Sequence, residues 1–157
     1  MSAARHILPA PRILIVEARF YAEIADELVA GATAALDEAG ATFERLAVPG
    51  AFEIPAAIAM AAKAGKRGTA GFDGYVALGC VIRGQTSHYD YVCGESARAL
   101  QDLAVGQRLA IGYGILTVED RDQAWIRADR RSGDKGRVAA EAALAMLAIR
   151  KHFGIGA

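Results

Sequence analysis

Two consecutive segments set the architecture of this chain: the apolar run Tyr75-Val-Ala-Leu-Gly-Cys-Val-Ile82 and the loop Arg83-Gly-Gln-Thr-Ser-His88. The run is typical of a strand covered on both faces, and a helical pattern begins near Tyr89. In a parallel α/β sheet, ligands bind where strand carboxyl ends meet helix N-termini, whose free amide groups and dipole favour anions. The loop brings a cation, two hydroxyls and an imidazole to such a place. This pattern predicts an anion site with a proton shuttle.

Strands and helices alternate on both sides of this unit. The expected strands are Arg12–Ala18, Thr42–Val48, Tyr75–Ile82 and Arg108–Val118, and the expected helices are Tyr21–Ala39, Ile54–Ala64, Tyr89–Ala104, Asp122–Ala128 and Lys135–His152. Such alternation requires right-handed crossovers and gives a parallel sheet between two layers of helices. We therefore expect an α/β fold, a flavodoxin-like three-layer αβα sandwich with a four-stranded parallel sheet.

The length and charge limit the possible classes of protein. With 157 residues the chain makes one domain, which we place at residues 12–157, after a flexible N-terminal arm at residues 1–11 that could pair with a neighbour's sheet edge. Lys and Arg together number 18, as do Asp and Glu, so the net charge is zero. Bulk electrostatics thus favour neither nucleic acid nor a membrane surface as a partner.

Hydropathy and cysteine content predict where the protein works. Residues 1–11 contain no apolar core of signal-peptide length, and no uninterrupted apolar stretch is long enough to span a membrane. Cys80 and Cys93 are too few and too far apart for a zinc ribbon or a redox pair, which fits a reducing cytoplasm. The many alanines favour close helix packing and leave surface to bury between subunits, so we also expect a homo-oligomer.

His88 is the candidate proton carrier, because it is the one histidine in an expected strand-to-helix loop and imidazole exchanges protons near neutral pH. A solvated histidine at a helix start is an equally simple interpretation. Ser87 and Asp90 also have the spacing of a capping box, in which case Thr86 and Ser87 merely cap the helix.

Three further positions could serve a ligand. Phe20 and Glu53 follow the first and second strands at the same sheet edge, where a ring can stack on a heterocycle and a carboxylate can bind hydroxyls. A core phenylalanine and a surface glutamate are the plainer interpretations. Arg127 forms a cluster with Arg130 and Arg131 that could grip phosphate, although such clusters are more often solvated. The sequence shows no Gly-x-Gly-x-x-Gly after the first strand, no Walker loop and no metal-ligand triad.

Together these positions resemble the lumazine synthase family. The similar segments, in family order, are Val48-Pro-Gly-Ala-Phe-Glu-Ile-Pro55, Gly79-Cys-Val-Ile-Arg-Gly-Gln-Thr-Ser-His-Tyr-Asp-Tyr-Val92, Gly114-Ile-Leu-Thr117, Gln123-Ala124 with Arg127, and Gly133-Asp-Lys-Gly136. The resemblance runs from about Arg12 to the C-terminus, and several long motifs at once are more specific than one short pattern.

The resemblance implies an enzyme that condenses 5-amino-6-(D-ribitylamino)uracil with 3,4-dihydroxy-2-butanone 4-phosphate, without metal or organic cofactor. It implies a homopentamer whose sites lie between neighbouring subunits. The implied roles are proton transfer by His88; binding of the ribitylaminouracil by Phe20, Ala51, Phe52, Glu53, Cys80, Val81, Ile82 and Tyr113, the last facing a neighbour's ligand; and phosphate binding by Gln85, Thr86 and Arg127.

Two alternatives remain at this stage. A non-catalytic relative that binds lumazine or flavin, or acts as a scaffold, would share the fold and even the pocket, because a fold does not fix a function. An unrelated flavodoxin-like electron carrier would hold a flavin, but the chain has no recognisable phosphate loop after its first strand.

Overall fold

The computed structural model describes residues 9–65 and 71–156, and within them four parallel strands form one sheet. The strands are β1 (Arg12–Ala18), β2 (Thr42–Val48), β3 (Gly74–Ile82) and β4 (Ala110–Val118), in the spatial order β2-β1-β3-β4. This order confirms the flavodoxin-like arrangement expected from the sequence. Residues 1–8, most of the predicted N-terminal arm, lie outside the described residues, so the arm stays a prediction.

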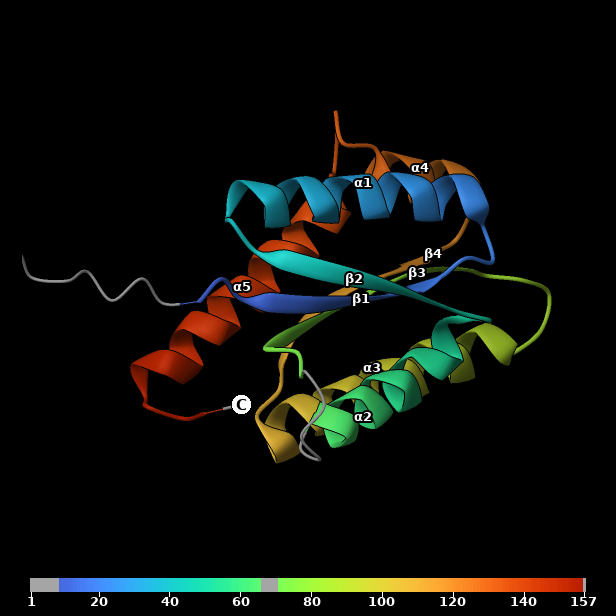
Figure 1. The fold of residues 1–157 in the computed structure, drawn as a ribbon. Helices are drawn as coiled ribbons and strands as arrows, with labels where there is room; N and C mark the ends of the chain where they lie inside the picture. The colour runs from blue at the N-terminus through green and yellow to red at the C-terminus, as the bar shows by residue number, and fades with distance from the viewer. Residues whose placement is uncertain (1–8, 66–70, 157) are drawn as a thin grey trace, which may run out of the picture.

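Helices cover both faces of the sheet and complete the three layers (Figure 1). On one face lie α1 (Ala22–Glu38), α4 (Arg121–Ala128) and α5 (Lys135–His152), and on the other lie α2 (Ile54–Gly65) and α3 (His88–Gln107). Each face has its own apolar core, centred on Leu28 and Ile15 under α1 and α5, and on Val16 and Ile58 under α2 and α3. None of the helices in the described ranges is long and apolar enough to cross a membrane.

Two glycines inside β4 allow α5 to lie close to the sheet. A Cβ at Gly114 would come within 2.9 Å of the Ala139 Cβ and 2.7 Å of a Leu78 methyl, and one at Gly112 would collide with the Ala139 carbonyl. Glycine weakens a strand in general, but here it makes room for a helix backbone. This contact explains why the strand prediction holds despite both glycines.

The elements differ from the predictions by more than one residue at two places. The residues Ala51–Glu53 form a short 3₁₀ helix, η1, directly before α2, where the sequence suggested only a break. Helix α3 runs to Gln107 instead of Ala104, and β4 begins at Ala110 instead of Arg108. Arg108 is the residue that ends α3, with a left-handed φ of 57°, so it cannot begin the strand.

Candidate functional site

A pocket of about 610 Å³ opens at the carboxyl ends of β1 and β3, between η1 and the start of α3. Its lining comes from the turn after β1, the segment around η1, the end of β3 and one side of α3. These residues are Phe20, Tyr21, Gly50, Ala51, Phe52, Glu53, Cys80, Val81, Ile82, His88, Tyr91, Val92 and Glu95. The pocket therefore lies at the sheet edge where ligands bind in α/β folds.

Eight residues predicted from the sequence line this pocket: Phe20, Ala51, Phe52, Glu53, Cys80, Val81, Ile82 and His88. Two of them are large rings that remain accessible, since Phe20 is 76% exposed and Phe52 is 55% exposed. The interpretation of Phe20 as a core residue is therefore wrong. An exposed ring beside an otherwise concave surface offers a face on which a planar ligand can stack.

The end of β3 offers free backbone groups to the pocket. Pairing between β1 and β3 stops at Glu17 and Leu78, whereas pairing between β3 and β4 continues to Ile82 and Val118. On the β1 side, the backbone from Cys80 onward consequently has no strand beside it. Unpaired backbone N–H and C=O groups at a pocket wall are suited to reading the edge of a heterocycle.

His88 is the first residue of α3, and its imidazole lies at the pocket. The side chain of Ser87 makes no capping hydrogen bond; the first turn is closed instead by the Asp90 N–H, which donates to the Ser87 carbonyl at 3.0 Å. The capping-box interpretation is thus wrong. Thr86 Oγ1 accepts a weak bond from the His88 N–H at 3.4 Å, which leaves the imidazole itself uninvolved.

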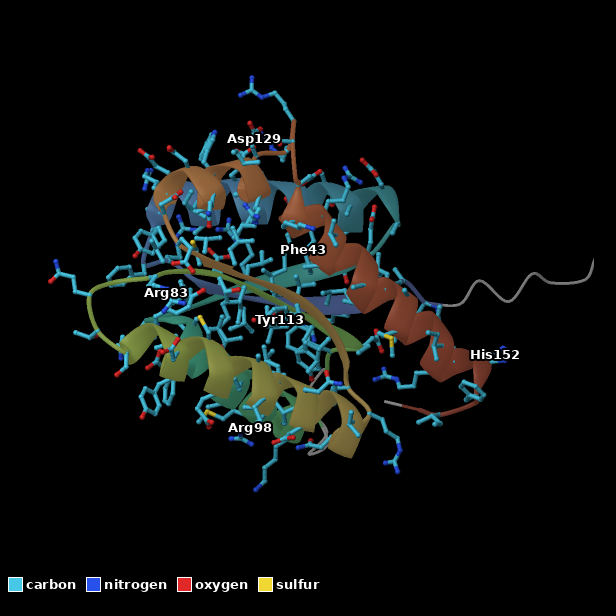
Figure 2. All side chains as sticks on the ribbon, turned by 180° about the vertical axis from the view of Figure 1, so that it is seen from behind. Phe43, Arg83, Arg98, Tyr113, Asp129 and His152 are labelled. Atoms are coloured by element: carbon cyan, nitrogen blue, oxygen red, sulfur yellow. The ribbon has the colours of Figure 1, made fainter. Side chains whose placement is uncertain are left out.

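Arg83 does not supply the free cation that the loop composition suggested. Its Nε donates to Glu119 at 2.8 Å, its Nη1 lies 3.4 Å from Asp90, and its guanidinium carbon stacks 4.2 Å from the centre of the Tyr89 ring. Figure 2 shows Arg83 beside the loop that leads from β3 into α3. The charge of Arg83 is therefore compensated within the chain, and an anion at this loop needs another cation.

Four predicted site residues do not line the pocket of their own chain. Gln85 and Thr86 are exposed in the loop before α3, three and two residues before the pocket residue His88. Tyr113 lies on the edge strand β4 and is 45% exposed, and Arg127 lies on α4, in the helix layer on the other face of the sheet. One chain therefore does not bring Arg127 and His88 together.

The arginines of the α4 region differ in their partners. Arg130 pairs with Glu27 and Arg131 with Asp129, as expected of a solvated surface cluster. The Arg127 guanidinium donates to the Gln123 carbonyl at 3.0 Å, and within residues 9–65 and 71–156 it has no carboxylate partner. Of the three, Arg127 is thus the one whose positive charge stays available to an anion.

The prediction missed the pocket residues on α3. Tyr91, Val92 and Glu95 follow His88 by three, four and seven residues, which places all four side chains on one side of the helix. Helical spacing from His88 would have identified them. Tyr21 and Gly50, which flank predicted residues, were also missed.

Cys80 is the one thiol that lines the pocket, and burial raises its pKa to about 11. A thiol with such a pKa is protonated at neutral pH and is a poor nucleophile. Within the described ranges, no group of three or more His, Cys, Asp or Glu side chains could hold a metal ion. His88 brings to the pocket an imidazole, the side chain that most often transfers protons in enzymes.

These features define an α/β protein with a small-molecule site at the carboxyl edge of a parallel sheet. The family model for 6,7-dimethyl-8-ribityllumazine synthase matches residues 10–151. One similar protein is 6,7-dimethyl-8-ribityllumazine synthase 1 of Rhizobium meliloti, which is 60% identical over 90% of this chain and 93% of the relative. Another is the 6,7-dimethyl-8-ribityllumazine synthase of Bartonella bacilliformis, which is 58% identical over 92% of this chain and 93% of the relative. The 6,7-dimethyl-8-ribityllumazine synthase of Agrobacterium fabrum is 57% identical over 92% of this chain and 97% of the relative.

The chain belongs to the 6,7-dimethyl-8-ribityllumazine synthase family. Members of the family are transferases of riboflavin biosynthesis. Their reaction, which is also that of this chain, condenses 5-amino-6-(D-ribitylamino)uracil with 3,4-dihydroxy-2-butanone 4-phosphate to give 6,7-dimethyl-8-ribityllumazine, phosphate and water.

Proposed function

We propose that the pocket binds the ribitylaminouracil, with the exposed ring of Phe20 stacked on the pyrimidine. The backbone of Cys80, Val81 and Ile82 then reads the pyrimidine edge from its β1 side, where no strand lies beside it. The 3₁₀ turn at Ala51–Glu53 holds the ribityl chain, whose hydroxyls donate to the Glu53 carboxylate. The observation that carries this proposal is the convergence of these three segments on one pocket that also contains His88.

The phosphate of the second substrate binds at the start of α3. Gln85 and Thr86 lie there, next to the free amide groups and the positive dipole end of a 20-residue helix. Because Arg83 is already paired with Glu119, a second cation is needed, and Arg127 is a cation without a carboxylate partner in the described chain. We infer that Arg127 reaches this phosphate from a neighbouring subunit.

His88 carries protons between the reacting groups. The pyrimidine amine attacks the ketone carbonyl and water leaves as the imine forms; phosphate is then eliminated, and ring closure releases a second water. Each step moves a proton to or from nitrogen or oxygen, and an imidazole can both accept and donate a proton. Holding both substrates in register supplies much of the acceleration, since an amine and a ketone react intrinsically.

The complete site is shared between subunits of a homopentamer in the cytoplasm. Tyr113 and Arg127 lie outside the pocket of their own chain, and the apolar side chains Tyr91, Val105 and Ile126 are more than half exposed. Neighbouring copies of the chain would cover such surface, as is usual for homo-oligomers. Two free cysteines fit a reducing compartment.

Lumazine fluorescence after mixing the purified protein with both substrates tests the residue roles. We expect His88→Ala to lower kcat about a hundredfold and Arg127→Ala to raise the KM of the ketone phosphate. His152→Ala and Arg131→Ala are the matched controls, because both residues lie away from the pocket, and both should keep wild-type rates. Full activity of His88→Ala would reject the proton-transfer role.

Mixed oligomers test the shared site. Chains carrying His88→Ala and chains carrying Arg127→Ala, co-expressed in equal amounts, form some sites with His88 from one chain and Arg127 from its neighbour. With random assembly about one quarter of the sites are intact, so activity should recover to about that fraction. If the mixture is no more active than the two variants apart, both residues serve the same chain's site.

A further inference from the structure

A buried carboxylate organises the turn that follows β1. Glu17, in the last part of the strand, has a side chain that is only 3% exposed, yet it accepts three guanidinium hydrogen bonds. Arg45 on β2 donates two of them, from Nε at 2.8 Å and Nη2 at 2.7 Å, and Arg19 donates the third at 2.8 Å. A buried carboxylate that accepts three hydrogen bonds from charged donors holds those donors in a defined geometry.

Arg19 connects this carboxylate to helix α1. While one of its terminal nitrogens bonds Glu17, the other bonds the Asp26 carboxylate in the second turn of α1. The guanidinium therefore bridges strand and helix across the turn that carries Phe20. Arg45 pairs with Glu17 as well, but it lies on the neighbouring strand and does not span the turn.

Phe20 has little else to hold it in place. Its ring is 76% exposed and makes an edge-to-face contact with Tyr21, with the ring centres 5.0 Å apart. Tyr21 precedes α1 and makes no side-chain capping bond, so the helix start is not fixed by a cap. The position of the ring over the pocket depends on the backbone of the turn, and the bridge formed by Arg19 joins the two ends of that turn.

We propose that Arg19 is a positioning residue, which holds Phe20 in the place where it stacks on the pyrimidine of the first substrate. The inference rests on the proposed role of the pocket as the ribitylaminouracil site. It assigns a function to a side chain that does not line the pocket. It also explains why a charged network is built onto a strand in which the neighbours of Glu17, Val16 and Ala18, are apolar and buried.

Replacing Arg19 or Arg45 by methionine separates positioning from stability. Each variant removes one partner of Glu17, but only Arg19→Met opens the bridge to α1. We expect Arg19→Met to raise the KM of the ribitylaminouracil about tenfold, the scale of one lost aromatic stack, with kcat at saturation within about twofold. The KM of the ketone phosphate should not change, which excludes a direct charge effect. Arg45→Met should lower the melting temperature and leave both KM values unchanged.

The double variant Phe20→Ala with Arg19→Met tests whether Arg19 acts through the ring. If it does, the double variant has the same KM for the ribitylaminouracil as Phe20→Ala alone, because coupled residues are not additive. Equal KM increases in Arg19→Met and Arg45→Met, or additive effects in the double variant, would overturn the inference. If Phe20→Ala itself leaves that KM unchanged, the proposed stacking role fails instead, so the two failures are distinguishable.

Discussion

Gly133 packs directly against the backbone of Arg127. The Gly133 N–H donates to the Ile126 carbonyl at 2.9 Å, and a Cβ at position 133 would lie 2.8 Å from the Arg127 Cα and 2.9 Å from its carbonyl oxygen. Such distances are shorter than real Cβ contacts, and the facing atoms are backbone atoms that cannot rotate away. The turn between α4 and α5 consequently limits where Arg127 can lie.

Gly133→Ala should therefore displace Arg127. We expect a loss of about 1–3 kcal/mol in the free energy of unfolding, as for other overpacked sites, and a higher KM for the ketone phosphate. Gly106→Ala is the control, since Gly106 lies in α3 with no atom near its missing Cβ, and there alanine should stabilise the helix slightly. Urea unfolding and steady-state kinetics measure both effects. A Gly133→Ala enzyme with wild-type KM would show that Arg127 tolerates the shift.

Asp120 fixes the other end of α4. It is the N-cap residue, and its Oδ1 accepts a hydrogen bond from the Gln123 N–H at 2.8 Å. Asp120→Ala should cost about 1 kcal/mol of unfolding free energy, whereas Asp120→Asn keeps the acceptor and most of the stability. Comparing the two variants by thermal unfolding isolates the cap. Equal losses in both would mean that the charge at Asp120, and not the capping bond, stabilises the helix.

The sequence predicted those parts of the molecule that depend on local pattern. Apolar runs and helical spacing predicted the strands, the helices and the layers, and the positions of Phe20 and His88 in strand-to-helix connections bring them to one edge of the sheet. Side-chain partners from distant segments were not predictable in this way. Arg83 is neutralised by Glu119, 36 residues later, so the loop's composition alone overstated its positive charge.

The network around Glu17 was missed for a related reason. In the sequence, Glu17 interrupts an apolar run and gives no sign of its partner Arg45, which is 28 residues away. The 3₁₀ helix at Ala51–Glu53 was also missed, because three residues are too few for a periodic signal. Sequence patterns and the family resemblance thus identified eight of the thirteen pocket residues, but not the contacts that hold them.

The Cys80 thiol should resist alkylation despite its place in the pocket. With a pKa of about 11, on the order of a thousandth of it is thiolate at pH 8. We expect iodoacetamide to label Cys80 slowly at pH 8 and about tenfold faster for each pH unit up to pH 10, measured on the modified peptide by mass spectrometry. The chain unfolded in urea is the control and should label quickly. Rapid labelling of the folded protein at pH 7 would contradict a protonated, partly buried thiol.

Glu17 should make stability depend on pH in the acid range. Burial alone raises the pKa of its carboxyl, but the hydrogen bonds from Arg45 and Arg19 outweigh burial, and the net pKa lies below the ordinary 4.5. A depressed pKa stabilises the fold above the ordinary value, and this contribution is lost as pH falls through the folded-state pKa. We expect Glu17→Gln to cost about 2 kcal/mol in unfolding free energy at pH 7. The difference from wild type should stay constant down to about pH 5 and shrink below about pH 4.5, since glutamine does not titrate.

Glu44→Gln, which breaks the exposed pair with Arg12, should change stability little at any pH. Urea titrations at several pH values measure these differences, and a Glu17→Gln gap that widens in acid would mean that Glu17 is protonated in the folded protein.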